Sequence, residues 1–444
     1  MKRIKRFLAL GMSLALLTGC GEKNASKNET AETGAEKPAA TESAGSVRFS
    51  WWGGDSRHEA TLKALDDFKT KHKDINVDAE YAGWTGYVEK QTTQMAGGTE
   101  ADLMQVNWGW LTTFSKDGSG YYDLNKLKDT IDLSNIPEEY LEQTTQNEVL
   151  NAVPISTTGK VFFWNKDTWE KAGLDLPKTW EDVEKAGPIF KEKLGEGYYP
   201  MDSDAYASFI LSLYRIEQKT GKPFIKEDNS EVNYTVEELK ESFDYYLKLV
   251  ELGCMPSLVE RNGYGTDTPL NELPPYVDGM YAGLYEWDSS IEKFANSLKS
   301  GPESLVVGEY LGNPDDHKAA LTKISMAYAI KKDTENPEGA ATLLNYLLND
   351  EEAIKIQGIE RGVPISTKAL EILEENDESA SRVFEANKKV LENTSNAISP
   401  YFESEDLKTI YKDTMQNIAY GEITTEEAAK NLIEAVNKKL QESN

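Results

Sequence analysis

Cysteine and histidine are scarce in this chain of 444 residues, which contains two cysteines and three histidines. Cys20 belongs to an N-terminal signal, which leaves Cys254 without a partner for an intramolecular disulfide. The histidines, His58, His72 and His317, lack the i, i+4 spacing of a metalloprotease pair. The sequence therefore predicts neither a resident metal ion nor a cofactor.

Motifs of common enzyme classes are also missing. There is no G-x-S-x-G nucleophile elbow, and Thr158-Gly159-Lys160 lacks the upstream glycine and the following Ser or Thr of a phosphate-binding loop. Asp202-Ser203-Asp204 begins like a calcium loop but lacks its glycine and terminal glutamate. Paired carboxylates could serve a glycosidase, but with 76 acidic residues such pairs arise by chance. No catalytic residue is predicted, and a secreted glycosidase stays only as an alternative.

Positively charged residues are in the minority, because the chain has 48 lysines and arginines and 76 acidic residues. The formal net charge is −28, and removing the first nineteen residues, which carry four positive charges and no acid, brings it to −32. A chain of this charge is repelled by nucleic acid and by anionic membrane surfaces. Nucleic acid is therefore excluded as a partner.

The first twenty residues have the pattern of a secretory signal. Four positive residues precede an apolar run over 7–17, which is shorter than the roughly 20 residues that span a bilayer. The run ends in Leu17-Thr18-Gly19-Cys20, which resembles the lipobox of bacterial lipoproteins. The resemblance implies that Cys20 is acylated and becomes the mature N-terminus.

Residues 21–46 contain no large apolar side chain and should form a disordered tether. A lipid anchor followed by a tether predicts a protein on the extracellular face of the cell membrane, of the Gram-positive type.

The roughly 400 residues after the tether are too many for one hydrophobic core, so two lobes are expected. Strand patterns at 47–52, 75–81 and 103–106 alternate with helix patterns at 60–68 and 87–96. This order predicts a parallel sheet with helices on its faces. Further strands are predicted at 161–164, 280–285, 305–308 and 324–330, and helices at 167–173, 180–193, 235–253, 337–348, 351–358 and 368–375.

Polar residues and tryptophans gather at the ends of the predicted strands, where ligands of open parallel sheets bind. Pyranose rings pack their C–H faces on aromatic rings and pair their hydroxyls with polar groups. The sequence therefore predicts a sugar-binding site whose residues, strand by strand, are Trp52, Asp55 and Arg57; Trp84; Asn107 and Trp108; and Trp287 and Asp288.

Four stretches of the mature chain, taken in order, carry a resemblance to a known family. They are Phe49-Ser50-Trp51-Trp52-Gly53-Gly54-Asp55; Phe163-Trp164-Asn165-Lys166-Asp167 with Pro177-Lys178-Thr179-Trp180-Glu181; Asp278-Gly279-Met280-Tyr281-Ala282-Gly283; and Asn336-Pro337-Glu338-Gly339-Ala340 with Arg361-Gly362-Val363-Pro364-Ile365-Ser366. In this order they resemble the family 1 extracellular solute-binding proteins, the receptors of carbohydrate importers of the ATP-binding-cassette (ABC) type.

The resemblance implies an α/β fold of two lobes, each a mostly parallel sheet flanked by helices, joined by a multi-strand hinge that closes on the ligand. It implies an oligosaccharide ligand and the membrane permease subunits of an ABC importer as partners, with the receptor a monomer. Crossings are expected near 155–160, 284–288 and 326–331. Lobe one would then comprise 47–157 and 286–328, and lobe two 158–285 and 329–444.

Carried over by position, Asp55, Arg57, Trp108 and Trp287 fall in regions that contact ligand, and Tyr206 falls where an aromatic residue of lobe two reaches the sugar. An arginine offers two parallel hydrogen bonds to a carboxylate. The run from Trp51 to His58 is similar to members that bind plant-polysaccharide fragments, some of them uronate-containing.

Other small solutes stay open as ligands, since relatives of this shape take polyamines or glycerol phosphodiesters. A polyamine site needs several converging carboxylates, which the loops at the strand ends do not supply. A purely structural surface lipoprotein would not explain the aromatic residues at those ends.

Overall fold

The computed structural model describes residues 45–265, 268–376 and 381–443. The signal with Cys20, and the tether as far as residue 44, lie outside the described residues. Within the described ranges, no helix has the length and apolar character needed to cross a membrane.

An eight-stranded sheet has the order β2-β1-β3-β9-β6-β7, with β8 beside β6 and β10 beside β9. Its strands are β1 (Ser46–Trp52), β2 (Asn76–Ala82), β3 (Leu103–Asn107), β6 (Val153–Asn165), β7 (Gly283–Trp287), β8 (Leu305–Val307), β9 (Ala320–Ile330) and β10 (Thr394–Ala397). A separate hairpin pairs β4 (Thr145–Gln146) with β5 (Val149–Leu150).

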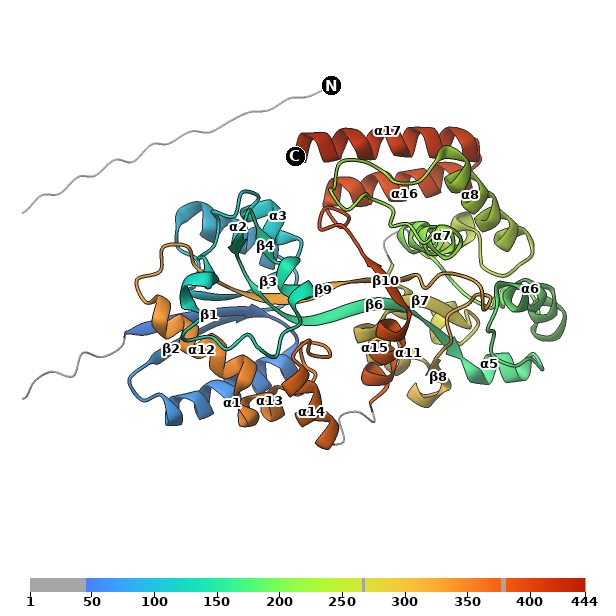
Figure 1. Cartoon of the computed structure of the whole chain (residues 1–444). Coiled ribbons are helices and arrows are strands. Elements are labelled where there is room, and N and C mark those ends of the chain that lie inside the picture. Colours follow the sequence, from blue (N-terminus) through green and yellow to red (C-terminus); the bar gives the residue numbers. More distant parts are fainter. Residues whose placement is uncertain (1–44, 266–267, 377–380, 444) are drawn as a thin grey trace, which may run out of the picture. The chain divides into compact units, whose positions relative to one another are not determined.

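Two long antiparallel strands, β6 and β9, connect the two halves of this sheet. The C-terminal half of β9 pairs with β3, whereas its N-terminal end pairs with β10. The first half of β6 pairs with β9, and its second half pairs with β7 and β8. Each strand therefore belongs to both lobes, and together they form the connection seen in Figure 1.

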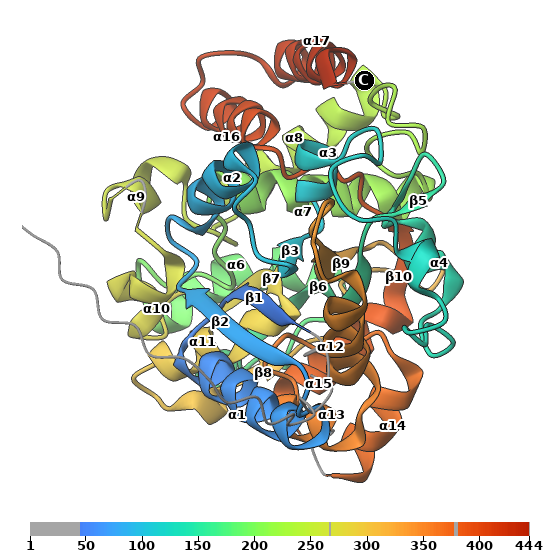
Figure 2. The same ribbon diagram turned by 90° about the vertical axis from the view of Figure 1, so that its left-hand side faces the viewer.

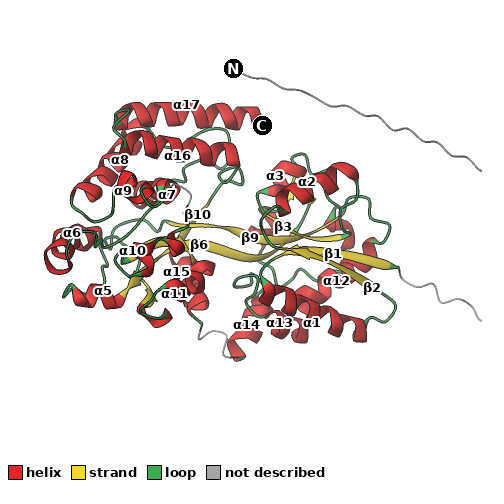
Figure 3. Ribbon diagram, turned by 180° about the vertical axis from the view of Figure 1, so that it is seen from behind, coloured by secondary structure: helices red, strands yellow, loops and turns green. Residues whose placement is uncertain are grey.

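Helices cover both faces of the sheet in each lobe (Figures 1 and 3). Lobe one carries α1 (Asp55–Lys71), α2 (Tyr87–Gly97), α3 (Trp110–Phe114), α4 (Glu138–Glu142), α12 (Pro337–Asn349), α13 (Glu351–Gln357) and α14 (Thr367–Glu375). In the view of Figure 2, α3 lies above the strands and α12 to α14 lie below them.

Lobe two carries α5 (Lys166–Lys171), α6 (Trp180–Leu194), α7 (Ala205–Thr220), α8 (Val236–Glu251), α9 (Leu258–Asn262), α10 (Pro274–Val277), α11 (Ile291–Ser297), α15 (Arg382–Asn393), α16 (Glu405–Ala419) and α17 (Thr425–Ser443). The predicted two-lobed α/β class is confirmed. Parallel pairing joins β2, β1 and β3, and β10 with β9, whereas the strands around the connection are antiparallel.

Local signals explain most of the elements. The capping box predicted before α8 is present: the Thr235 hydroxyl accepts from the Glu238 N–H, and the Glu238 carboxylate accepts from the Thr235 N–H at 2.7 Å. Helix α7 was not predicted, because an unbroken run of buried residues at 208–214 hides the alternation of polar and apolar faces.

The lobe boundaries after residue 285 differ from those predicted. β7 does not cross between the lobes but pairs with the second half of β6, and the following helix α11 packs against α15 of lobe two. α12 and α13 pack against α1, where the Tyr346 hydroxyl donates to the Ala64 carbonyl at 3.0 Å. Residues 288–319 thus belong to lobe two and residues 331–376 to lobe one, because among the strands that the structure describes only β6 and β9 are long enough to reach both lobes.

Candidate functional site

An aromatic cluster lies at the carboxyl ends of β1, β2 and β3. Trp52 contacts Trp84, Tyr87 and Trp110, with ring centroids 5.3, 5.4 and 5.1 Å away. Trp84 stacks on Trp110 at an interplanar angle of 9°. Trp52 and Trp110 are buried, whereas Trp84 is 50% exposed. Trp84 therefore offers an aromatic surface at the edge of the sheet where the sequence predicted one.

Arg57, in the first turn of α1, lies beside this cluster. Its Nε donates to the Glu360 carbonyl at 2.7 Å and its Nη1 to the Trp52 carbonyl at 3.1 Å. No carboxylate of the described residues forms an ion pair with it within 4.0 Å. Burial and the neighbouring Arg361 lower the pKa of Arg57 to about 10, so it stays protonated at neutral pH. The charge of Glu360 partly opposes this lowering of the Arg57 pKa, although Glu360 forms no ion pair with Arg57 within 4.0 Å.

A second arginine in the same region, Arg361, is buried, and the sequence did not single it out as a site residue. Its guanidinium donates to the neutral side chains of Gln105, Gln357 and Thr61 at 2.9, 3.3 and 2.8 Å. These partners hold Arg361 inside lobe one, on β3, α13 and α1. Its charge adds to the positive potential around Arg57.

On lobe two, a charged cluster surrounds Trp287 at the end of β7. The ammonium nitrogens of Lys160 and Lys323 lie 4.7 and 4.4 Å from centroids of the Trp287 ring system. Lys160 pairs with Glu286, and Lys323 pairs with Glu403. Burial lowers the pKa of Lys323, although Glu403 opposes the shift. Trp287 therefore makes cation–π contacts with two ammonium groups.

Tyr206 lies in the first turn of α7, close enough to this cluster for the charges of Glu403 and Glu286 to affect its pKa. Its hydroxyl is buried and has no hydrogen-bond partner within the described residues. Burial, Glu403, Tyr411 and Glu286 raise its pKa well above the usual range, so it stays a neutral hydroxyl. The hydrogen-bonding capacity of the Tyr206 hydroxyl is therefore unused among the described residues.

The lysines and glutamates of this cluster were missed in the sequence. Lys160 and Lys323 stand within runs that otherwise read as apolar or small-residue strands. A lysine at such a position, buried to 2% exposure in the case of Lys160, indicates either an ion pair or a ligand contact. That signal could have identified both residues.

Asp288 is placed differently from the prediction. It is 1% exposed, and its two carboxylate oxygens accept from Thr158 at 2.5 Å and from Asn387 at 2.7 Å. Both oxygens are used within the protein, because Asp288 connects β6, the end of β7 and α15. It stabilises lobe two and does not face a ligand.

The other predicted site residues of lobe one, which are Asn107, Trp108 and Asp55, differ in exposure and in their hydrogen bonds. The Asn107 side chain accepts from the Gly109 N–H at 3.0 Å and shapes its own loop. Trp108 is 5% exposed, and its Nε1 donates to the Gln143 carbonyl at 3.0 Å. Asp55 is exposed at the start of α1. Of these three, Asp55 is the one with a freely accessible side chain.

A pocket of about 500 Å³ lies between the lobes. Lobe one contributes Trp108, Thr112 and residues between Glu142 and Gln146. Lobe two contributes residues from 223–229 and 396–401. We call this cavity the interlobe pocket.

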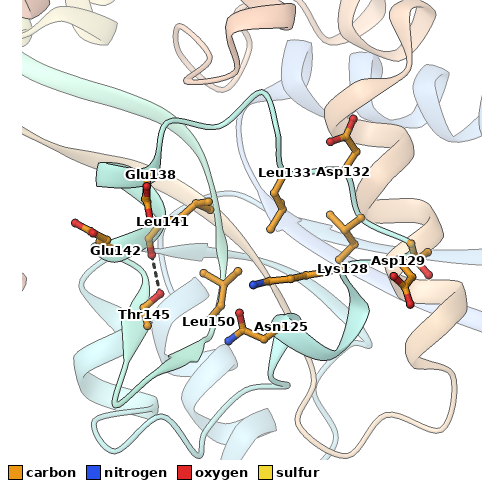
Figure 4. A pocket seen from close by; sticks show the side chains of 12 residues that line it. Asn125, Lys128, Asp129, Asp132, Leu133, Glu138, Leu141, Glu142, Thr145 and Leu150 are labelled. Carbon is orange, nitrogen blue, oxygen red and sulfur yellow. Dashed lines mark hydrogen bonds between the residues drawn. The ribbon is translucent and has the colours of Figure 1, made fainter.

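A cavity of about 650 Å³ lies on lobe one alone, between residues 125–133 and 138–150 (Figure 4). The side chains of Leu133, Leu141 and Leu150 point toward one another there, whereas Asp132 and Glu142 point away from them. None of the predicted site residues lines this cavity. It is separate from the groups at the strand ends.

The molecule has two α/β lobes joined by two long strands, and each lobe carries a cluster of aromatic and charged groups. These features define a two-lobed binding protein. Residues 54–354 match the family model of the bacterial extracellular solute-binding proteins, and the chain belongs to this family. It is thus a solute-binding protein of ABC-type import, in a family that binds substrates.

Solved structures agree with this assignment. A periplasmic oligogalacturonide binding protein from Yersinia enterocolitica, in complex with saturated digalacturonic acid, is 38% identical, with 90% of this chain and 99% of that chain covered and a TM-score of 0.80. A periplasmic solute binding protein from Pectobacterium atrosepticum is 34% identical over 90% and 99% of the two chains, with a TM-score of 0.83. The acarbose-binding GacH receptor of Streptomyces glaucescens, 17% identical over 89% and 98%, shares the fold with a TM-score of 0.72.

Proposed function

We propose that this protein captures a uronate-containing oligosaccharide outside the cell and delivers it to the membrane permease subunits of an ABC importer. The observation that carries the proposal is Arg57, a half-buried arginine beside an aromatic cluster, which no carboxylate of the described residues approaches within 4.0 Å. Glu360 attracts the Arg57 charge only from beyond ion-pair distance, and a ligand carboxylate would supply a direct counter-ion. The protein itself performs no chemistry on the ligand in this proposal.

The Yersinia enterocolitica neighbour supports the ligand class, because it binds an oligogalacturonide and is 38% identical over nearly its whole length. The site on this chain has both parts that such a ligand needs. Trp84 offers a surface for the sugar ring, and Arg57 offers donors to the carboxylate. Tyr206 and the Lys160 and Lys323 ammonium groups would contact the ligand from lobe two.

Ligand capture would proceed by closure of the two lobes about β6 and β9. The contacts divide between the lobes, so a ligand gains all of them only in the closed state. Closure is favoured by the free energy of these additional contacts. The closed receptor would then dock on the permease as a monomer.

We further propose that Cys20 is acylated and tethers the receptor to the extracellular face of the cell membrane. The proposal rests on the sequence Leu17-Thr18-Gly19-Cys20. The Cys20→Ser protein should then appear in the culture medium, whereas the wild-type protein should fractionate with membranes. Equal fractionation of both proteins would contradict the anchor.

A thermal-shift screen tests the ligand class. The panel contains digalacturonate, neutral disaccharides, polyamines and glycerol phosphodiesters. Binding to the native state alone raises stability by about 2.7 kcal/mol at a hundredfold excess over Kd. A shift with digalacturonate alone supports the proposal, and a shift with polyamines or phosphodiesters alone would replace it. Hydrolysis of a bound galacturonide during incubation would instead support the alternative that the protein is a glycosidase.

A further inference from the structure

The interlobe pocket has a different chemistry from the surroundings of Arg57. Its volume of about 500 Å³ lies within the range of small-molecule sites, roughly 300–1,000 Å³. Uncharged polar side chains line it, including Thr112, Gln143, Gln146 and Ser399. Amides and hydroxyls can both donate to and accept from sugar hydroxyls.

Aromatic surface is present in the same pocket. Trp108 reaches it from lobe one and Tyr401 from lobe two. Trp108 is held in place by its bond to the Gln143 carbonyl. The pocket thus combines ring surface with uncharged hydrogen-bonding groups, which is the pairing that a pyranose requires.

The charges of the pocket disfavour an anion. Glu142 and Glu227 are exposed and line it from the two lobes. Lys226, the only cation among its described lining residues, is paired with Glu231. A ligand carboxylate in this pocket would meet two carboxylates and no free cation.

One loop joins the pocket to the region of Arg57. Trp108 lines the pocket, and Trp110, two residues later, packs on Trp52 and Trp84. Asn107, which begins the loop, pairs with Met326 of β9, and the Met326 sulfur lies 3.6 Å from Arg57 Nη1. The loop after β3 thus carries both a lining residue of the interlobe pocket and a residue of the aromatic cluster beside Arg57.

We infer that the interlobe pocket is a subsite for an uncharged sugar ring, so that the preferred ligand joins a free uronate to a neutral or esterified unit. This inference rests on the proposed function, since Arg57 must hold the free uronate. The cationic and the uncharged regions together would select oligosaccharides of mixed charge over fully acidic ones.

Calorimetric titration of the purified protein with trigalacturonate and its three monomethyl-ester isomers tests the inference. One isomer, with the ester in the interlobe pocket, should bind at least about fivefold more tightly than unesterified trigalacturonate, since removing repulsion between exposed charges yields about 1 kcal/mol. The Glu142→Gln/Glu227→Gln double variant should bring trigalacturonate close to that affinity. The control double variant, Glu139→Gln/Asp228→Asn, changes two exposed acids that do not line the pocket and should leave the ratio unchanged.

Gln146→Ala should weaken binding of the tight isomer by a larger factor than it weakens binding of digalacturonate, because only the trimer has a further ring for the interlobe pocket. Tightest binding of unesterified trigalacturonate by the wild-type protein would overturn the inference, and so would equal affinity for all four trimers. Binding of none of the galacturonides would instead overturn the proposed function.

Discussion

Trp108 and Trp110 are separated by one residue, yet they extend into two different surroundings. Trp108 lines the interlobe pocket and donates to the Gln143 carbonyl, whereas Trp110 packs on Trp52 in the aromatic cluster. The intervening Gly109 donates to the Asn107 side chain, which sets the turn of the loop. A single loop at the end of β3 thus supplies one indole that lines the interlobe pocket and one that supports Trp84 from behind in the aromatic cluster.

Trp84 and Trp52 should respond differently to truncation. Trp84→Ala removes a ring that is half exposed and should lower galacturonide affinity about 3- to 10-fold with little loss of stability. Trp52→Ala removes a buried ring and should cost about 3–5 kcal/mol of unfolding free energy. Urea unfolding and calorimetric titration of both variants measure the two effects. Unchanged affinity in Trp84→Ala would remove this residue from the site.

Asp288 should matter for stability and not for affinity. Asp288→Ala leaves Thr158 and Asn387 unpaired in the interior, at about 1–3 kcal/mol for each group. Asp288→Asn keeps an acceptor and should cost less. Chemical denaturation reports the loss, and titration of the folded variants should return the wild-type Kd. A stable Asp288→Ala protein that no longer binds ligand would contradict this assignment.

The pair of Lys323 and Glu403 is nearly buried and should show strong coupling. Lys323→Met alone leaves the Glu403 carboxylate without its partner and should destabilise the protein by about 3–5 kcal/mol. The double variant Lys323→Met/Glu403→Leu should lose less than the single variant, because no unpaired charge is left. A double-mutant cycle by urea unfolding measures the coupling. Additive losses would show that the two residues do not depend on each other.

Glu80 should make the folding stability of lobe one decrease at acidic pH. Burial raises the pKa of Glu80, but hydrogen bonds from Lys90, Gln94 and Arg48 outweigh it and lower the value to about 2. The folded state therefore binds this proton less tightly than the unfolded state, whose carboxyl has an ordinary pKa near 4.5. Its contribution to stability is complete above about pH 4.5 and is lost as the pH falls toward about 2.

The thermal midpoint of the wild-type protein should accordingly fall more steeply with acid than that of Glu80→Gln. If the thermal midpoints of the wild-type and Glu80→Gln proteins fall equally with decreasing pH, Glu80 makes no such contribution. Glu89→Gln serves as the matched control, because Glu89 is an exposed acid on α2 whose carboxylate has no hydrogen bond or ion pair among the described residues.

The first three strands and the residues at their ends could be predicted, because alternating strand and helix patterns fix where the carboxyl edge of a parallel sheet lies. Trp52, Trp84 and Arg57 were predicted to lie at these strand ends, and the structure has them there; their contact with a ligand stays a prediction. The Lys160–Glu286 and Lys323–Glu403 pairs could not be found, since their partners are 126 and 80 residues apart in the chain. Sequence proximity carries no information on which distant charges meet.

Asp288 was misassigned for the same reason. Its position beside Trp287 at a strand end favoured a ligand contact, but Thr158 and Asn387 reach it from 130 and 99 residues away. The lobe boundaries failed because the length of a strand, and not its apolar pattern, decides whether it reaches both lobes. β7 has 5 residues, whereas β6 has 13 and β9 has 11.

Calorimetric titration of the wild-type and Arg57→Met proteins with digalacturonate and its dimethyl ester tests the central claim most directly. The account predicts that the wild-type protein binds the acid more tightly than the ester. It also predicts that Arg57→Met weakens binding of the acid by between about 10- and 100-fold, the range of a hydrogen bond to a charged group, and leaves the ester unchanged. Equal wild-type affinity for acid and ester, or full retention of acid binding by Arg57→Met, would contradict it.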